Sequence, residues 1–356
     1  MVEFDQLTKN HYILSKKSNT KYFTKLGLLN SSENYNDLLL VTQDGQWDTF
    51  SWETEPTESF SELLYERCRQ LRDKYGWLIL YYSGGSDSET VLQSFINSGV
   101  HLDEVVLNVF KINDSDPPLK DVELAINKLK KYSLQIPKTK MTINNLSRDV
   151  FLNFNKKQLW IDSSFNGTLG NFRRMTLPVL QELGQKVVLP NTRIGHIFAE
   201  TKPHLRKEDD GYYAVWGTNI GVGQWSEWFF TTLDLPNLHL KQCHMVKNYF
   251  KLNNPKEKVI IELGKVRDQI ISACRNTFDN SYQPPKTTGL LQDYINTYSE
   301  DGLVIKHLKT YDPELYDIYT NATVKEMLSG VRNHSLYDRS RGELRKVKTE
   351  RFYLGT

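Results

Sequence analysis

A run of small and acidic residues between Ser83 and Ser88 has the composition of a phosphate-binding turn. It reads Ser-Gly-Gly-Ser-Asp-Ser. The two glycines let the backbone bend tightly and approach a ligand closely, and the serines offer hydroxyl donors. The acidic residue suits a phosphate site only if a cation such as Mg²⁺ intervenes. The candidate anion-binding residues are therefore Ser83, Gly84, Gly85, Ser86, Asp87 and Ser88, with Asp87 as the metal ligand. An ordinary helix N-cap is the alternative interpretation.

The residues on either side predict that this run joins a strand to a helix. Residues 77–81 form an unbroken apolar stretch, which is typical of a buried parallel strand. Val91, Leu92 and Phe95 then recur at helical spacing, and Gly99 supplies a stop. Free N–H groups and the helix dipole at the start of such a helix favour an anion.

The six residues resemble the SGGxDS loop of the PP-loop superfamily, the N-type ATP pyrophosphatases, and not the GxxxxGK[ST] loop of Walker type. The resemblance covers roughly residues 76–206. It implies an adenine nucleotide alpha-hydrolase-like fold in which the loop holds the phosphates of ATP with Mg²⁺. It also implies that ATP is cut between its α and β phosphates, that an acceptor is adenylated, and that a nucleophile then displaces AMP.

A second strand is predicted at residues 104–110, which completes a strand-helix-strand unit and therefore a parallel sheet. In the superfamily the end of this strand meets the adenine ring. The resemblance thus places Asn108, Val109 and Phe110 near the base, through their backbone groups. For their side chains a plain core strand is the favoured interpretation.

Residues 191–206 form a second informative stretch, after a fourth strand predicted at 186–190. The stretch loosely resembles the late G-x-R-x-x-E-S-x-x-R pattern of the PAPS-reductase branch, although the arginine expected after the glycine is absent. The resemblance implies a nucleotide contact at Gly195. Lys202 and Arg206 would then stabilise charge on the phosphates, with Glu200 in support. A surface helix with ordinary ion pairs is the alternative.

The chain is expected to divide into an N-terminal β-rich module (1–56), an α/β ATP-binding domain (57–235) and a helical C-terminal region with a basic tail (236–356). Asp44-Gly45 lies between apolar runs at 38–42 and 47–52 and predicts a hairpin. Further helices are expected at 57–75, from 117 onward, at 147–159, near 172, and at 239–249, 257–276, 288–298 and 313–328. In the helix from 117, the inward residues are expected to be Val122, Leu124, Ala125 and Leu129. Further strands are expected at 138–143 and 212–216.

Three features leave alternatives open. Trp228, Phe229 and Phe230 could line an acceptor pocket or fill the core at a domain junction. Residues 332–351 carry seven basic and three acidic residues, which fits an anion-facing strip or a solvated surface helix. Cys243 beside His244 could act as a thiol nucleophile, but an ordinary buried cysteine is favoured.

The composition restricts the class of protein. The chain has 356 residues, 39% of them hydrophobic, a net charge of +2 and three cysteines. The small net charge makes no case for nucleic acid, and the cysteines have no CxxC spacing, which favours a reducing compartment. Apolar runs stay far below membrane-spanning length. We therefore expect a cytoplasmic protein without a membrane partner.

Together these observations predict an ATP- and Mg²⁺-using enzyme that adenylates an acceptor, forms AMP and pyrophosphate, and passes the acceptor on for amidation or thiolation. The acceptor is a small molecule or a nucleic acid, and a separate nitrogen or sulfur donor fits the chemistry. A tRNA- or DNA-modifying enzyme of the same fold is one alternative. A non-catalytic ATP-binding module is the other.

Overall fold

The computed structural model describes residues 11–22, 28, 31–110, 120–146, 192–199, 204–215, 226–253, 313, 335, 337–338, 343–344 and 347–356. Several predicted elements lie outside these residues: the helices at 147–159, near 172, at 257–276 and at 288–298, the strand at 186–190, and nearly all of the helix at 313–328. Glu200 and Lys202 also lie outside them.

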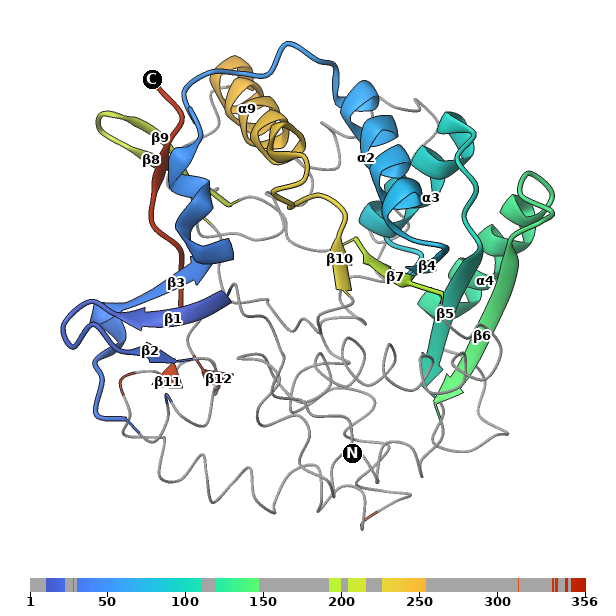
Figure 1. Cartoon of the computed structure of the whole chain (residues 1–356), viewed down its shortest axis with the longest axis horizontal. Helices are drawn as coiled ribbons and strands as arrows, with labels where there is room; N and C mark the ends of the chain where they lie inside the picture. Colours follow the sequence, from blue (N-terminus) through green and yellow to red (C-terminus); the bar gives the residue numbers. More distant parts are fainter. Residues whose placement is uncertain are drawn as a thin grey trace.

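The central element is a five-stranded parallel sheet (Figure 1). Its strands are β4 (Trp77–Tyr81), β5 (Glu104–Phe110), β6 (Lys140–Leu146), β7 (Ile194–Phe198) and β10 (Ser226–Trp228). They lie in the order β10-β7-β4-β5-β6. The predicted α/β class, with a parallel sheet flanked by helices, is confirmed. Residues 194–198 form β7 and residues 204–208 form a further strand, β8 (His204–Glu208), so the alternative of a surface helix over 191–206 is wrong at these described positions.

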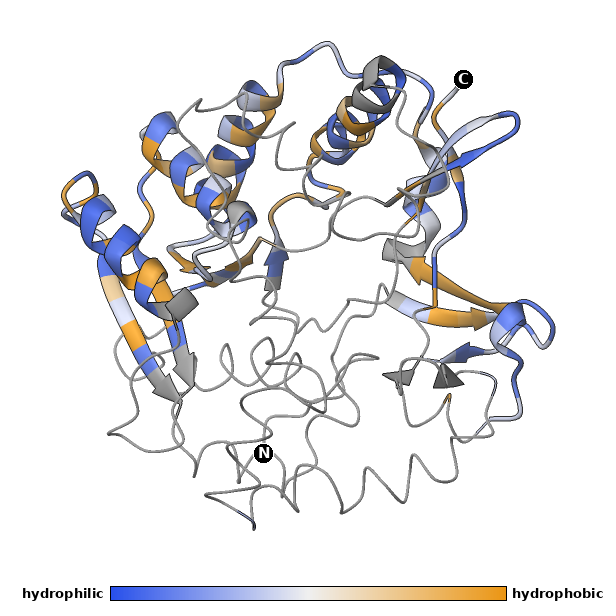
Figure 2. Cartoon of the chain, turned by 180° about the vertical axis from the view of Figure 1, so that it is seen from behind, coloured by the Kyte–Doolittle hydropathy of each residue, from blue (hydrophilic) through white to orange (hydrophobic). Residues whose placement is uncertain are grey.

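In the described part of the chain, four long helices accompany this sheet: α2 (Phe60–Lys74), α3 (Ser86–Ser98), α4 (Lys120–Ser133) and α9 (Pro236–Asn253). Ser59 caps α2, because its hydroxyl accepts a hydrogen bond from the N–H of Glu62 while the Glu62 carboxylate accepts one from the N–H of Ser59. Apolar and polar residues alternate along the helices (Figure 2). The apolar residues pack on one face of the sheet. Helix α3 ends at Gly99, as predicted, and this glycine has the left-handed conformation.

The core between helices and sheet contains alternate residues of the central strands. Leu78 and Leu80 of β4 and Val105 and Leu107 of β5 meet the apolar faces of α2, α3 and α4. Leu124 is 38% exposed, so its predicted inward position is wrong, whereas Ala125 and Leu129 face the core as predicted. Phe229 and Phe230 also lie in this core, which supports the core interpretation for those two rings.

Small antiparallel sheets accompany the parallel sheet and lie to its left in Figure 1. One contains β1 (His11–Ser15), β2 (Lys21–Tyr22) and β3 (Leu38–Thr42), in the order β2-β1-β3; the short 3-10 helix η2 (Tyr35–Asp37) precedes β3. The predicted β-rich N-terminal module is therefore present. The predicted hairpin is wrong, because β3 pairs with β1 and leads into the 3-10 helix η3 (Gln43–Thr49). Burial of Trp47 and Trp52 in a separate core with α9 outweighs the local turn signal.

A second antiparallel sheet contains β8 (His204–Glu208), β9 (Gly211–Val215) and β13 (Phe352–Tyr353), in the order β13-β9-β8. β11 (Tyr337–Asp338) pairs with β12 (Glu343–Leu344). The interpretation of residues 332–351 as a surface helix is therefore wrong at the described positions. In the part of the chain that the structure describes, no helix has the length and apolar character needed to cross a membrane.

Candidate functional site

The loop between β4 and α3 has the shape that its glycines predict. Gly84 has a φ of +72°, in the left-handed region that favours glycine. A Cβ atom added there would lie 2.6 Å from the Cβ of Ala125 on α4. Helix α4 thus packs directly against the backbone of the loop. A side chain at this position would both strain the backbone and push the two elements apart.

Serine hydroxyls hold the loop in this shape. The hydroxyl of Ser88 is buried; it accepts a hydrogen bond from the N–H of Ser83 at 3.2 Å and donates one to the carbonyl oxygen of Gly85 at 3.1 Å. The Ser83 and Ser88 hydroxyls lie 3.1 Å apart. Ser83 is exposed, whereas Ser88 faces inward. The structure therefore gives Ser88 an internal role and leaves Ser83 at the surface of the loop.

Helix α3 begins directly after the loop. Gly85 is its N-cap residue and has no side chain with which to cap the first N–H groups of the helix. Asp87 lies in the first turn and is partly exposed. Nothing is described of the Ser86 side chain. Among the described residues, no group of three histidine, cysteine, aspartate or glutamate side chains could hold a metal ion.

The loop lies at the topological switch point of the sheet. From β4 the chain passes through α3 to β5 on one side, whereas β7 lies on the other side of β4. In open parallel sheets ligands bind outside the carboxyl ends of the strands at such a point. The loop follows the carboxyl end of β4, so the fold places the predicted anion site where a ligand site is expected.

The strand end predicted to meet adenine lies at the same edge of the sheet. Asn108, Val109 and Phe110 are the last residues of β5 and pair in register with Asn144, Asn145 and Leu146. The side-chain oxygen of Asn108 accepts a hydrogen bond from the Asn144 amide at 3.2 Å. Beyond their backbone positions, nothing is described of the Val109 and Phe110 side chains.

Of the residues predicted from the second stretch, the two that the structure describes, Gly195 and Arg206, do not lie at the loop. Gly195 is the second residue of β7 and pairs with Leu78, near the opposite end of the strands from the loop. A Cβ atom at Gly195 would lie 2.7 Å from the ring of Tyr75, so close packing against that ring explains the glycine. Arg206 lies in β8, which is in a different sheet and, in Figure 1, on the other side of α9 from α2 and α3.

His196 lies between Gly195 and Ile197, and Ile197 stands where the resembled pattern has an arginine. The imidazole of His196 is fully buried, and its Nδ1 lies 3.0 Å from the hydroxyl of Tyr81. Burial lowers the pKa of His196 to about 4. The side chain is therefore uncharged near neutral pH and does not replace a cationic phosphate ligand.

Neither described cysteine is an activated nucleophile. Cys243 is fully buried, and burial raises the pKa of its thiol well above the usual value. The neighbouring His244 places its Nε2 2.9 Å from the carbonyl oxygen of Trp52. Burial also raises the pKa of Cys68 to about 12. Both thiols are structural core groups, as the sequence interpretation favoured for Cys243.

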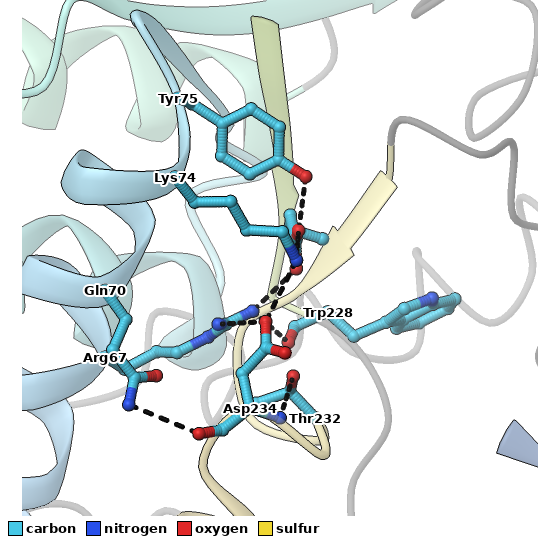
Figure 3. Close-up of polar contacts among 8 residues, drawn as sticks. Arg67, Gln70, Lys74, Tyr75, Trp228, Thr232 and Asp234 are labelled. Carbon is cyan, nitrogen blue, oxygen red and sulfur yellow. Dashed lines mark hydrogen bonds and ion pairs between the residues drawn. The ribbon is translucent and has the colours of Figure 1, made fainter. Parts of the chain in front are cut away.

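A buried ion cluster fixes the edge strand β10 against α2 (Figure 3). The guanidinium of Arg67 is fully buried and lies 2.7 Å from the carboxylate of Glu227. The Glu227 carboxylate also accepts a hydrogen bond from the Tyr75 hydroxyl. Lys74 contacts Glu227 at 2.8 Å and Asp234 at 2.9 Å. These contacts join the end of α2 to β10 and hold the edge of the parallel sheet in place.

At least one basic residue of the tail forms an intramolecular ion pair. The guanidinium of Arg351 pairs with Glu208 and lies over the ring of Tyr213, 4.8 Å from its centroid. The acidic Glu350 beside it pairs with Lys16 of the N-terminal module at 2.6 Å. Both pairs are partly exposed, and at these described positions the charged side chains of the tail contact other parts of the protein.

The sequence interpretation missed two residues next to the loop, Glu89 and Lys128. Glu89 directly follows the loop motif in the sequence, which was the available signal. Lys128 lies on α4 and forms an ion pair with Glu89, which is 39 positions away in the sequence. No local pattern connects Lys128 with the loop.

Comparisons with known proteins give only remote likenesses. No protein-family model and no curated protein matches this sequence. The solved structures that resemble it include an NH3-dependent NAD synthetase from Campylobacter jejuni, with 15% identity and a TM-score of 0.33 over 77% of this chain and 97% of that chain. An NMN synthetase from Francisella tularensis has 11% identity and a TM-score of 0.33, over 69% and 97%. A glutamine-dependent NAD+ synthetase from Acinetobacter baumannii has 12% identity and a TM-score of 0.31, over 90% and 56%. At these TM-scores the likenesses carry no argument about activity.

Proposed function

We propose that this protein is an ATP-using enzyme of the PP-loop type, in which the loop from Ser83 to Ser88 binds the phosphates of ATP. The observation that carries the proposal is the backbone at Gly84, which has a positive φ and packs against α4 at the switch point of a parallel sheet. A turn of this kind before a helix presents backbone N–H groups to an anion. The motif and its structural context therefore agree.

In the proposed reaction, an oxygen atom of the acceptor attacks the α-phosphorus of ATP. The bond between this phosphorus and the bridging oxygen breaks, and pyrophosphate leaves with the bonding electrons. An amine or a sulfur nucleophile then displaces AMP from the acceptor. Mg²⁺, when bound at Asp87, would neutralise charge that develops on the phosphates. The acceptor, whether a small molecule or a nucleic acid, and the nitrogen or sulfur donor belong to this proposal.

The residues take different parts in it. The N–H groups at the start of α3 and the exposed Ser83 contact phosphate, while Ser88 holds the loop. The backbone of Asn108, Val109 and Phe110 lies near the adenine. Glu200 and Lys202 are assigned to the phosphates by family resemblance only. Arg206 is left out of the phosphate contacts, because β8 lies in a different sheet from the loop. Gly195 has no place among the nucleotide contacts in this proposal, because it lies near the far end of β7.

The test is the product formed from ATP and Mg²⁺ by the wild type and by Asp87→Ala. Free amino acids, nucleobases, bulk tRNA and DNA are added in turn as acceptors. We expect AMP and pyrophosphate, stimulated by one acceptor class and reduced at least about 100-fold in the variant, because the metal loses its protein ligand. Asp73→Ala, which removes a carboxylate from the last turn of α2, is the matched control and should keep the activity.

Two results would overturn the proposal. Formation of ADP and orthophosphate would exclude cleavage between the α and β phosphates. Tight ATP binding without turnover on any acceptor, with and without glutamine, ammonia or sulfide, would favour the non-catalytic binding module.

A dependence of acceptor binding on salt concentration would identify nucleic acid as the acceptor class.

A further inference from the structure

A buried negative charge lies directly after the phosphate loop, in the first turn of α3. Glu89 is in the first turn of α3 and is 2% exposed. Its backbone N–H donates to the carbonyl oxygen of Gly85 at 3.0 Å. Since a helix rises about 1.5 Å per residue, the carboxylate lies within about 10 Å of the start of the helix.

The Glu89 carboxylate ties together the elements that shape the loop. It accepts a hydrogen bond from the hydroxyl of Tyr82, directly after β4, and another from the hydroxyl of Tyr132, on α4. The amide of Gln93 on α3 donates to the Tyr132 hydroxyl at 3.0 Å. One carboxylate thus connects the residue before the loop, the helix after it and the helix that packs on Gly84.

Lys128 supplies the opposite charge at the same carboxylate. Its ammonium group lies 3.2 Å from Glu89, and its side chain is 27% exposed. Lys128 is three residues from Ala125, the residue that contacts Gly84, so both lie on the same side of α4. A buried carboxylate without this cation would repel a polyanion bound at the loop.

We propose that Lys128 is a positioning residue of the phosphate site, which cancels the charge of Glu89 so that the hydrogen bonds of this carboxylate can hold the loop without repelling ATP. The inference rests on the proposed function. It adds that anion affinity at the loop depends on the net charge of the Glu89–Lys128 pair. If the ion pair were merely structural, loss of either partner would lower stability, and both losses would change the affinity for MgATP in the same direction.

The test measures the Kd of MgATP by calorimetry and the Tm of each variant. We expect Lys128→Met to weaken MgATP binding about tenfold or more, because the Glu89 charge is then uncompensated. Glu89→Gln should leave affinity unchanged or raise it, and the double variant should return to within about threefold of the wild type. Lys128→Arg keeps the charge and should bind normally. Lys130→Met removes an exposed lysine from the same helix and is the matched control.

The outcomes separate the two proposals. If the wild type does not bind MgATP, the proposed function fails, and this inference fails with it. If the wild type binds but Lys128→Met matches Lys130→Met, the inference alone is overturned. Weaker binding in both single variants, without recovery in the double variant, would also overturn it, because the pair would then be structural. If Glu89→Gln does not fold, the comparison of Lys128→Met with Lys128→Arg and Lys130→Met decides. Weaker MgATP binding in Lys128→Met alone supports the inference, and equal binding in all three overturns it.

Discussion

At Gly84, two independent constraints exclude a side chain. The φ of +72° is unfavourable for any residue with a Cβ atom, and the added atom would overlap Ala125. Gly99 offers a natural comparison, because it has a φ of +68° but nothing within 4 Å of an added Cβ atom. The two glycines therefore share the backbone conformation and differ in the packing contact.

This pair gives a prediction at the scale of the residue. Gly99→Ala should lower the free energy of unfolding by about 1–2 kcal/mol, the cost of a left-handed non-glycine residue. Gly84→Ala should cost a further ~1–3 kcal/mol from overpacking against α4, and it should weaken MgATP binding. Urea unfolding of both variants measures the difference. Equal costs for the two substitutions would show that α4 does not press on the loop.

At the scale of the element, the ion cluster of Arg67, Lys74, Glu227 and Asp234 joins α2 to the edge strand β10 (Figure 3). Burial by itself would raise the pKa of Glu227, but Arg67, Lys74 and Tyr75 outweigh burial and hold the pKa below its usual 4.5. The side chain therefore stays ionised in the folded protein at neutral pH. Its charge is needed because the guanidinium of Arg67 is fully buried.

Replacement of this carboxylate tests the cluster. Glu227→Gln leaves the buried guanidinium of Arg67 with only the more distant and partly exposed carboxylate of Asp234, at 3.5 Å. It should lower the free energy of unfolding by about 3–5 kcal/mol at pH 7. Glu66→Gln removes the partner of Arg69 from an exposed pair on the same helix and should cost less than about 1 kcal/mol. Denaturant unfolding at pH 7 measures both variants. A loss in Glu227→Gln no larger than in the control would contradict a buried, coupled pair.

The same cluster predicts a dependence of stability on pH. Because the pKa of Glu227 is lower in the folded than in the unfolded protein, its contribution is complete above pH 4.5 and is lost as the pH falls through the folded value. Asp234 acts in the same direction. Wild-type stability should therefore decrease below about pH 4.5 more steeply than that of Glu227→Gln. Parallel pH profiles of the two proteins, obtained from denaturant unfolding, would refute this assignment.

At the scale of the whole molecule, residues 347–356 connect parts of the protein that are distant in the sequence. Val347 packs in the core of the N-terminal sheet, and the N–H of Leu40 donates to the carbonyl oxygen of Lys348 at 2.9 Å. Phe352 stacks on Trp52 with their ring centroids 4.3 Å apart, and β13 pairs with β9. This segment passes from one antiparallel sheet to the other.

Phe352→Ala should therefore affect regions far from the substitution. We expect a loss of about 3–5 kcal/mol in the free energy of unfolding, as for other buried aromatic residues. Hydrogen exchange at the amides of β3 should become faster, because Leu40 depends on the same segment. Tyr353→Ala, at the partly exposed neighbouring position, is the control. Unchanged exchange in β3 would mean that the N-terminal sheet is held independently of this segment.

The sequence by itself determined the local features that depend on neighbouring residues. The strand, glycine turn and helix from Trp77 to Gly99 follow from a buried apolar run, residues that tolerate tight turns and helical periodicity, all within a short stretch. The capped helix α2 and the strands β5 and β6 are local in the same sense. For this reason the class of fold and the core of the candidate site could be predicted before the structure was known.

Only the tertiary structure decided which distant segments meet. β7 lies beside β4 although more than 100 residues separate them. The register of this pairing places Gly195 next to Leu78, near the end of the strands that is far from the loop. Burial of Trp47 and Trp52 against α9 and Phe352 overrode the Asp-Gly turn signal, and the pair of Glu89 with Lys128 joins two helices. Such contacts depend on packing between elements, which the spacing of residues along the chain does not encode.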